Sequence, residues 1–282
     1  MRFAFMPILS EQVPSWPSLL EMWQAADETD FFESGWVFDH FSATAVDAAG
    51  PCYEAWTILS ALAQATHRLR LGTMVLSVAR RHPALLAQMT LTLDTISAGR
   101  IELGLGAGWR EADHRPHGIS MGAPPIRADR LEEGCAALIP LLSGGRLSAH
   151  GHHFAMDEAE CDIPPVQQPH PPICIGGKGE LRTLRIAARW AQHWNYPGEC
   201  AAEFSRKRAL LHRYCTRLAR DPAAITTSAT VLAERSTPET TIRKVSQLAA
   251  AGADLVILRL RPPYGTAAVE SLITTLSSLG RN

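Results

Sequence analysis

Residues 99–118 read GRIELGLGAGWREADHRPHG. Residues 100–106 are a short run of apolar and small residues, which predicts a buried strand. Gly106 and Gly108 stand at its end, where a residue without a Cβ lets the backbone approach a ligand or take a positive φ. A large aromatic and several titratable groups follow at once: Trp109, Arg110, Glu111, Asp113 and His114. This order predicts the rim of a pocket, and a plain strand, turn and polar loop is an equally good interpretation.

Strand and helix patterns alternate on both sides of this stretch. Apolar runs predict eight strands, at residues 2–8, 34–40, 68–77, 100–106, 172–177, 193–196, 225–233 and 254–260. The segments between them predict helices, at residues 14–26, 54–66, 84–96, 126–142, 180–191, 201–220, 237–251 and 267–279. Apolar strands alternating with helices are typical of a parallel sheet covered by helices. Eight units in about 250 residues are typical of a (β/α)8 barrel. We therefore predict an α/β fold, a single-domain TIM barrel over residues 1–282, with an open doubly wound sheet as the alternative.

Residues 144–168 depart from this regular pattern. They are rich in His and Pro and predict an irregular insertion before the fifth strand, with a small hairpin around Gly151. Its candidate metal ligands are His150, His152, His153, Asp157 and Glu160. Their spacing fits no standard zinc pattern, and imidazoles in a loop are more often solvated or hydrogen-bonded. We expect no metal site.

The composition is that of a globular protein of ordinary charge. The 282 residues are 46% hydrophobic and 20% charged, with a formal net charge of −1. This charge gives no reason to expect nucleic acid or an anionic membrane as a partner. The six cysteines include no CxxC pair, which favours reduced thiols over disulfides or zinc. The N-terminal residues lack the apolar core of a signal peptide, and no apolar run is long enough to span a bilayer. We expect a cytoplasmic protein.

In a TIM barrel the catalytic groups lie at the carboxyl ends of the strands. Here those ends carry Asp39, His40, Ser77, the segment 106–111 with His114, Gly176, Gly177, Lys178, Trp194 and Asn195. These are mainly glycines, titratable groups and aromatics. Neither the GxSxG elbow of serine hydrolases nor the GxxxxGK[ST] loop of nucleotide triphosphatases is present.

Several segments together resemble the luciferase-like monooxygenase superfamily, and within it the bacterial coenzyme F420-dependent oxidoreductases. They are SGWVFDHF at 34–41, EAWTILSALAQATHRLRLGTMVLSVARRHPALLAQM at 54–89, TLDTISAGRIELGLGAGWREADHRPHGI at 92–119, HPPICIGGKGELRTLRIAARWAQHWN at 170–195 and RDPA at 220–223. The resemblance implies a barrel with an insertion near the fifth strand, and a tricyclic flavin or deazaflavin at the barrel mouth. It also implies a non-prolyl cis peptide at Met74–Val75, behind the central ring.

The resemblance implies catalytic roles for two residues. His40 matches a histidine that stands beside the reactive carbon of the ring and acts in proton transfer or stabilises the charged intermediate. Its neighbour Asp39 need not face the same ligand atoms, because adjacent residues of a strand point to opposite faces. Glu111 matches a proton-donating acid of related sugar-phosphate dehydrogenases. The alternatives are a strand-capping pair for Asp39 and His40, and a solvated loop glutamate for Glu111.

The residues expected at the cofactor are Asp39, Met74, Val75, Ser77, Ala107, Gly108, Trp109, Ile175, Gly176, Gly177, Lys178 and Gly179. Residues 176–179 precede a helix, so backbone N–H groups there would suit a cofactor phosphate. A glycine-rich turn with surface arginines is the alternative.

We therefore expect a flavin- or deazaflavin-dependent oxidoreductase that exchanges a hydride between coenzyme F420 and a small organic substrate. The alternatives are an FMN-dependent monooxygenase that uses reduced flavin and molecular oxygen, and a flavin-binding protein without turnover. A metal-dependent barrel hydrolase is a more distant alternative. We expect a homodimer, a small-molecule substrate, and neither nucleic acid nor membrane as a partner.

Overall fold

A computed structural model describes residues 1–9, 15–41 and 52–279. The main sheet contains β1 (Arg2–Pro7), β2 (Ser34–Val37), β3 (Arg70–Thr73), β4 (Leu76–Ser77), β5 (Ile101–Gly106), β8 (Ile173–Gly176), β9 (His193–Tyr196), β10 (Thr226–Leu232) and β11 (Leu255–Leu260). The helices are α1 (Trp16–Asp27), α2 (Ala55–Ala65), α3 (Pro83–Ile96), α4 (Pro124–Leu142), α5 (Thr183–Trp190), α6 (Ala201–Arg217), α7 (Pro238–Ala250) and α8 (Thr266–Ser277). Short 3-10 turns are η1 (Glu111–Asp113), η2 (Arg115–His117) and η3 (Pro222–Ala224).

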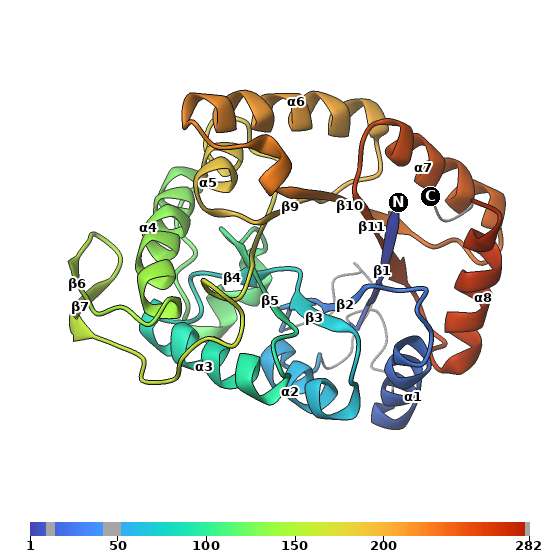
Figure 1. Ribbon diagram of the computed structural model, residues 1–282, viewed down its shortest axis with the longest axis horizontal. Coiled ribbons are helices and arrows are strands. Elements are labelled where there is room, and N and C mark those ends of the chain that lie inside the picture. The colour runs from blue at the N-terminus through green and yellow to red at the C-terminus, as the bar shows by residue number, and fades with distance from the viewer. Residues whose placement is uncertain (10–14, 42–51, 280–282) are drawn as a thin grey trace.

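The sheet closes into a parallel barrel, so the predicted fold is confirmed and the open-sheet alternative is wrong. The strand order is β3-β2-β1-β11-β10-β9-β8-β5-β4, and β3 also pairs with β5, which joins the two edges. β3 and β4 are two parts of one barrel strand, both paired with β5. The helices surround the strands as an outer ring (Figure 1).

Alternation along the strands separates two apolar cores. In β1, Phe3 and Phe5 belong to the large core between the strands and the helices, whereas Ala4 and Met6 belong to a smaller core inside the barrel. The inner core also contains Trp36, Met74, Cys174, Leu255 and Ile257. The barrel is therefore filled below its mouth, and ligand chemistry is confined to its open end.

The strand predicted at residues 68–77 is interrupted. The Met74–Val75 peptide is cis, as the resemblance implied, and separates β3 from β4. Opposite the break, Gly104 lies so close to β3 that a Cβ would be 1.7 Å from the carbonyl oxygen of Thr73. The Thr73 hydroxyl donates to the Gly104 carbonyl at 3.1 Å and accepts from the Gly104 N–H at 3.2 Å. These contacts hold the two strands together at the point where β3 ends.

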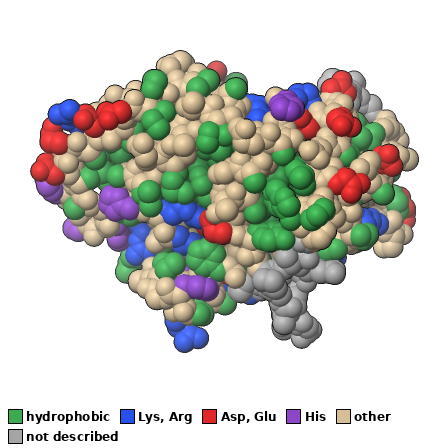
Figure 2. Space-filling model, turned by 90° about the horizontal axis from the view of Figure 1, so that it is seen from below, with side chains coloured by type: hydrophobic (Ala, Val, Ile, Leu, Met, Phe, Trp, Pro, Cys, Tyr) green, Lys and Arg blue, Asp and Glu red, His purple; other side chains and the backbone are tan. Residues whose placement is uncertain are grey.

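The predicted insertion contains an antiparallel hairpin, β6 (Leu147–His150) and β7 (Ala155–Ala159), as expected around Gly151. Glu133 of α4 holds its turn, because the carboxylate accepts from the N–H groups of His153 at 2.9 Å and Phe154 at 2.6 Å. The hairpin projects beyond α4 at one end of the molecule (Figure 1), where charged and histidine side chains gather on the surface (Figure 2).

Among the helices that the structure describes, none combines the length and the apolar character needed to cross a membrane. All six cysteines lie in the described residues and have free thiols.

Candidate functional site

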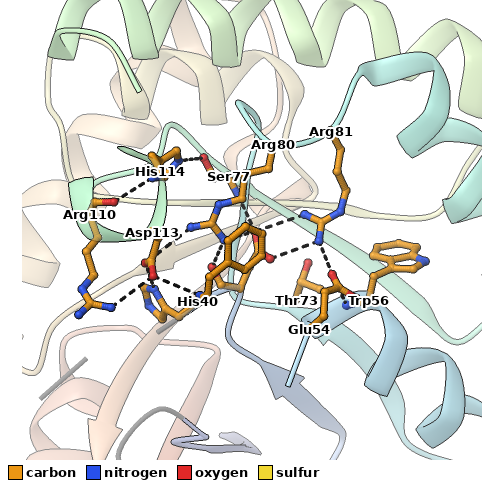
Figure 3. Close-up of polar contacts among 12 residues, drawn as sticks. His40, Glu54, Trp56, Thr73, Ser77, Arg80, Arg81, Arg110, Asp113 and His114 are labelled. Carbon is orange, nitrogen blue, oxygen red and sulfur yellow. Dashed lines mark hydrogen bonds and ion pairs between the residues drawn. The ribbon is translucent and has the colours of Figure 1, made fainter. Parts of the chain in front are cut away.

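His40 and Asp113 meet at the barrel mouth (Figure 3). His40 lies in the segment after β2, three residues beyond Val37, and Asp113 ends the η1 turn that follows β5. The His40 Nδ1 lies 2.6 Å from Asp113 Oδ2. The Asp113 side chain is fully buried, and that of His40 is 13% exposed. An ionised carboxylate only accepts hydrogen bonds, so Nδ1 carries the proton in this contact. Nε2 of His40 makes no hydrogen bond to another described residue.

Asp39 has a different set of partners from His40, although both residues lie beyond β2, which ends at Val37 and not at the predicted residue 40. Its Oδ2 accepts from the Ser77 N–H at 3.1 Å and lies 3.0 Å from Arg80 Nη1. Its two carboxylate oxygens each lie 3.3 Å from a nitrogen of Arg81. Asp39 therefore fixes the segment after β3 to the end of β2 and lies away from the imidazole of its neighbour.

Asp39, Glu54, Arg80, Arg81, Arg110 and Asp113 form one connected set of charges, which we call the mouth cluster. Arg80 lies 3.6 Å from Asp113, Arg110 lies 3.3 Å from Asp113, and Arg81 is paired with Glu54. Within the described residues the mouth cluster holds three carboxylates and three guanidinium groups. Its formal charge balances while His40 is neutral, and a proton on His40 would add an uncompensated charge in a mostly buried place.

The pKa directions of His40 and Asp113 agree with this balance. Burial lowers the pKa of His40, and the charges of Arg80 and Arg110 lower it further. The hydrogen bond to Asp113 and the negative charge of that carboxylate raise the pKa, but the net result is a decrease. Burial raises the pKa of Asp113, but its hydrogen bonds to His40 and Phe41 and the neighbouring positive charges outweigh burial, so its pKa falls. Both shifts favour a carboxylate that faces a neutral imidazole.

A second buried imidazole lies beside Ser77. His114 Nδ1 is 2.8 Å from the carbonyl oxygen of Arg110, which only accepts, so this nitrogen donates. Its Nε2 lies 2.9 Å from the Ser77 hydroxyl. Gly108, at a φ of +80°, leaves room for both, because a Cβ there would be 2.8 Å from Ser77 Oγ. The positive φ and this close approach explain the glycine.

An apolar platform lies between the mouth and the inner core. Phe38 and Val75 are partly buried and pack on that core. Two glycines make room for Val75: a Cβ on Gly106 would lie 2.5 Å from Val75 Cγ2, and one on Gly176 2.8 Å from Val75 Cγ1. The Phe38 ring lies beside that of His40, with the centroids 5.6 Å apart. Apolar side chains next to an imidazole have the chemistry that the ring of a flavin or deazaflavin requires.

The loop at residues 176–179 is only partly available for a phosphate. The Gly177 N–H is already donated to the Asn195 carbonyl at 3.0 Å, and the Gly177 carbonyl accepts from the Trp194 indole at 2.8 Å. The backbone N–H groups of Lys178 and Gly179 make no hydrogen bond to another described residue. Helix α5 starts at Thr183, later than the predicted residue 180.

The other expected cofactor and catalytic residues differ in their exposure. Trp109 is 70% exposed and contacts the edge of the His40 ring, with the ring centroids 5.9 Å apart. Ile175 is fully buried in the outer core, so only its backbone is available to a ligand. Ala107 is partly buried against the same core. Glu111 is exposed, and its side chain makes no hydrogen bond to another described residue. The structure thus brings Asp113, rather than Glu111, to His40.

A second carboxylate–imidazole pair lies deeper in the barrel. His193 Nδ1 is 2.6 Å from Glu102, and its Nε2 is 2.6 Å from the hydroxyl of Ser228. The Asn195 amide donates to the same hydroxyl at 2.9 Å. Glu102 and His193 lie near the amino-terminal ends of β5 and β9, away from the mouth. We interpret this chain as part of the filled barrel interior.

The residues at the mouth to which sequence reasoning gave no catalytic or cofactor-binding role are Asp113, His114, Arg80, Arg81, Glu54 and Phe38. A signal existed for the first two, because they lie in the titratable run after β5. The basic run at residues 80–82 was also visible, but its partner Asp39 is 41 residues from Arg80 and 42 from Arg81.

Within the described ranges, no three His, Cys, Asp or Glu side chains are grouped so that they could hold a metal ion.

Comparison with known proteins places the chain in a family. The model of the luciferase-like monooxygenase family matches residues 3–270. A phthiodiolone/phenolphthiodiolone dimycocerosates ketoreductase from Mycobacterium tuberculosis is 31% identical over 252 residues, covering 81% of this chain and 64% of that protein. The chain thus spans slightly less than two thirds of the length of this relative.

Two solved structures share the fold at low sequence identity. An F420-dependent secondary alcohol dehydrogenase in complex with an F420–acetone adduct has a TM-score of 0.82 at 18% identity, over 98% of both chains. The monooxygenase RslO1 from Streptomyces bottropensis has a TM-score of 0.80 at 18% identity, over 98% of this chain and 97% of that one.

Proposed function

The chain belongs to the luciferase-like monooxygenase family, and from this premise we propose that it is an oxidoreductase that exchanges a hydride between coenzyme F420 and a small organic substrate. The observation that carries the proposal is the contact of His40 with Asp113 beside an apolar platform at the barrel mouth. The similarity to a ketoreductase supports a carbonyl or alcohol as the reacting group.

The chain's own residues would divide the work as follows. F420, when bound, supplies the hydride acceptor or donor. Phe38 and Val75 would support its ring, and Gly106 and Gly176 would leave room for Val75 to do so. His40 takes a proton from the substrate oxygen when an alcohol is oxidised and returns it when a ketone is reduced, since a positioned imidazole suits this task.

Three further roles are part of the proposal. Glu111, on the loop after β5, is the second titratable group that could serve the substrate. The N–H groups of Lys178 and Gly179, which donate to none of the described residues, would bind the cofactor phosphate. The remaining expected cofactor contacts come from Asp39, Met74, Ser77, Ala107, Gly108, Trp109, Ile175 and Gly177.

Parallel titrations of the purified protein with F420 and FMN, read by fluorescence quenching, test the cofactor. We expect F420 to bind more tightly than FMN. Reduced F420 should then be oxidised without oxygen in the presence of a ketone. The protein would not be an F420 enzyme if it bound only FMN, or bound F420 and passed no hydride to any carbonyl compound.

An FMN-dependent monooxygenase is the second candidate, because RslO1 shares the fold almost as closely as the dehydrogenase does. Oxygen uptake with reduced FMN that depends on an organic substrate would support it. A flavin-binding protein without turnover would bind cofactor and show neither reaction.

We also propose that the protein acts as a homodimer in the cytoplasm. Six free thiols are in keeping with a reducing compartment. Light scattering after size-exclusion chromatography tests the assembly, and a monomeric mass would refute it.

A further inference from the structure

Among the described residues, Asp113 is the only one whose carboxylate contacts the ring of His40. Its Oδ2 is 2.6 Å from Nδ1, while its Oδ1 accepts from the Phe41 N–H at 3.1 Å and lies 3.3 Å from Arg110. Each oxygen therefore has its own partners. The side chain is fully buried, so it cannot turn toward solvent. The carboxylate thus faces the imidazole in one fixed orientation.

The groups around His40 determine which nitrogen holds its proton. Asp113 faces the ring from η1, Arg110 from the loop before η1 and Arg80 from the loop after β4, and the rings of Phe38 and Trp109 flank it. Both arginines only donate hydrogen bonds. Asp113 is thus the acceptor that retains a proton on Nδ1, and the neutral ring is left with a lone pair on Nε2.

We propose that Asp113 is a positioning residue that holds neutral His40 with its proton on Nδ1, so that Nε2 accepts the hydroxyl proton of a secondary alcohol substrate. This inference rests on the proposed function. In the reaction the C–H bond of the alcohol breaks and its electron pair leaves as hydride to oxidised F420. The O–H bond breaks as its proton passes to Nε2, and the carbon–oxygen double bond forms. The reverse sequence reduces the ketone.

Asp113→Asn is the decisive variant because it keeps the shape and changes the donor pattern. The Phe41 N–H and Arg110 both donate toward Oδ1, so the amide oxygen should stay there. The amide NH2 then takes the place of Oδ2 and donates to Nδ1. The neutral ring must move its proton to Nε2, which can no longer accept. An Asp-to-Asn change opposite a catalytic imidazole can act in this way, through the wrong tautomer.

The first readout is NMR of the protein without cofactor, labelled with 15N at histidine, with the His40 signals assigned from His40→Asn. In the wild type, we expect neutral His40 to carry its proton on Nδ1. In Asp113→Asn, we expect it on Nε2, with a lower His40 pKa because the carboxylate charge is gone. Neutral wild-type His40 protonated on Nε2 would overturn the proposal even if the variant failed to fold.

The second readout is the pH profile of kcat/KM for alcohol oxidation. In the wild type it should rise as His40 loses its proton. In Asp113→Asn the plateau value of kcat/KM should fall by about 10²–10⁴-fold, while the affinity for F420 should change only a few-fold. Asp113→Glu, which keeps an acceptor-only carboxylate, should recover part of the loss. A folded Asp113→Asn protein with the wild-type profile and tautomer would refute the role.

Glu102→Gln is the matched control. Glu102 makes a contact of the same length, 2.6 Å, with His193 deeper in the barrel. The Glu102→Gln substitution should lower the free energy of unfolding and leave the His40 tautomer and the pH profile unchanged. If Glu102→Gln moved the profile as Asp113→Asn does, the effect would be general and the proposal would fail. If the wild type bound no F420, the proposed function would fail, while the NMR result would still decide the position of the proton.

Discussion

Val75 occupies the space that the side chain of residue 106 would need: a Cβ on Gly106 would lie 2.5 Å from Val75 Cγ2. Val75 belongs to the cis peptide between β3 and β4, and Gly106 is the last residue of β5. The absence of a side chain on one strand therefore sets the position of an apolar side chain on the next.

Gly106→Ala should displace Val75 and lower the free energy of unfolding by about 1–3 kcal/mol, as overpacking does. It should also weaken cofactor binding. In the double variant with Val75→Ala the clash is relieved, so stability should return while cofactor affinity stays low. Urea unfolding and fluorescence quenching measure the two effects. Full recovery of affinity in the double variant would show that Val75 does not support the ring.

His40→Ala should reduce turnover by about 10²–10⁴-fold, because a positioned acid or base contributes that much. Cofactor affinity should stay within a few-fold of the wild type. Steady-state kinetics and a binding titration separate the two quantities. His150→Ala, at an exposed residue of the hairpin, is the control and should leave both unchanged. Loss of cofactor binding in His40→Ala would instead make His40 a docking residue.

Glu111→Gln should cost less turnover than His40→Ala, about 10-fold, because an exposed carboxyl shares its task with water. The comparison uses the same kinetic assay at one pH. A loss as large as that of His40→Ala would transfer the main proton-transfer role to Glu111, and unchanged turnover would remove it from the mechanism.

Arg80→Met should destabilise the protein by about 3–5 kcal/mol, since it removes a buried positive charge that two buried carboxylates share. The Arg80 side chain is only 3% exposed and lies 3.0 Å from Asp39 and 3.6 Å from Asp113. Urea denaturation measures the change. Arg146→Met removes an exposed arginine that pairs with Glu158 and Glu160 on the hairpin, and it should have little effect. Equal effects would show that burial at the mouth does not matter.

His40 should also make stability depend on pH. Its pKa in the folded protein is below its ordinary value of 6.5, so between these values the unfolded chain binds more protons. The stability that this pKa difference contributes is fully present above about pH 6.5. It is lost as the pH falls through the pKa of His40 in the folded protein. The wild type should therefore lose stability relative to His40→Gln as the medium is acidified from neutrality. Parallel stability curves for the two proteins would contradict the lowered pKa.

The sequence predicts the barrel well because each strand and helix carries its own periodic signal. The elements at residues 193–196 and 237–251 lie within one residue of the observed β9 and α7. The run at residues 68–77 reads as one strand because nothing in its apolar pattern marks the break. That break was implied at Met74–Val75 only by the resemblance, and the structure confirms it there.

The site was less predictable, because its contacts join residues far apart in the chain. His40 and Ser77 were expected from their strand ends. Asp113 was one of several titratable residues after β5, and no local pattern singles it out from Glu111. The η1 turn determines which of the two contacts His40, since it buries Asp113 and leaves Glu111 exposed. A turn of three residues carries no periodicity that sequence reading can use.

The contact between His40 and Asp113 spans 73 positions of the chain, and the mouth cluster also takes members from before α2 and before α3. The carboxylate that contacts His40 comes only after β5 in the chain, and the glycines that make room for Val75 lie on β5 and β8. A chain that ended before β5 would contain His40 and Val75 without these partners. The contacts at the mouth therefore require strands from both halves of the barrel.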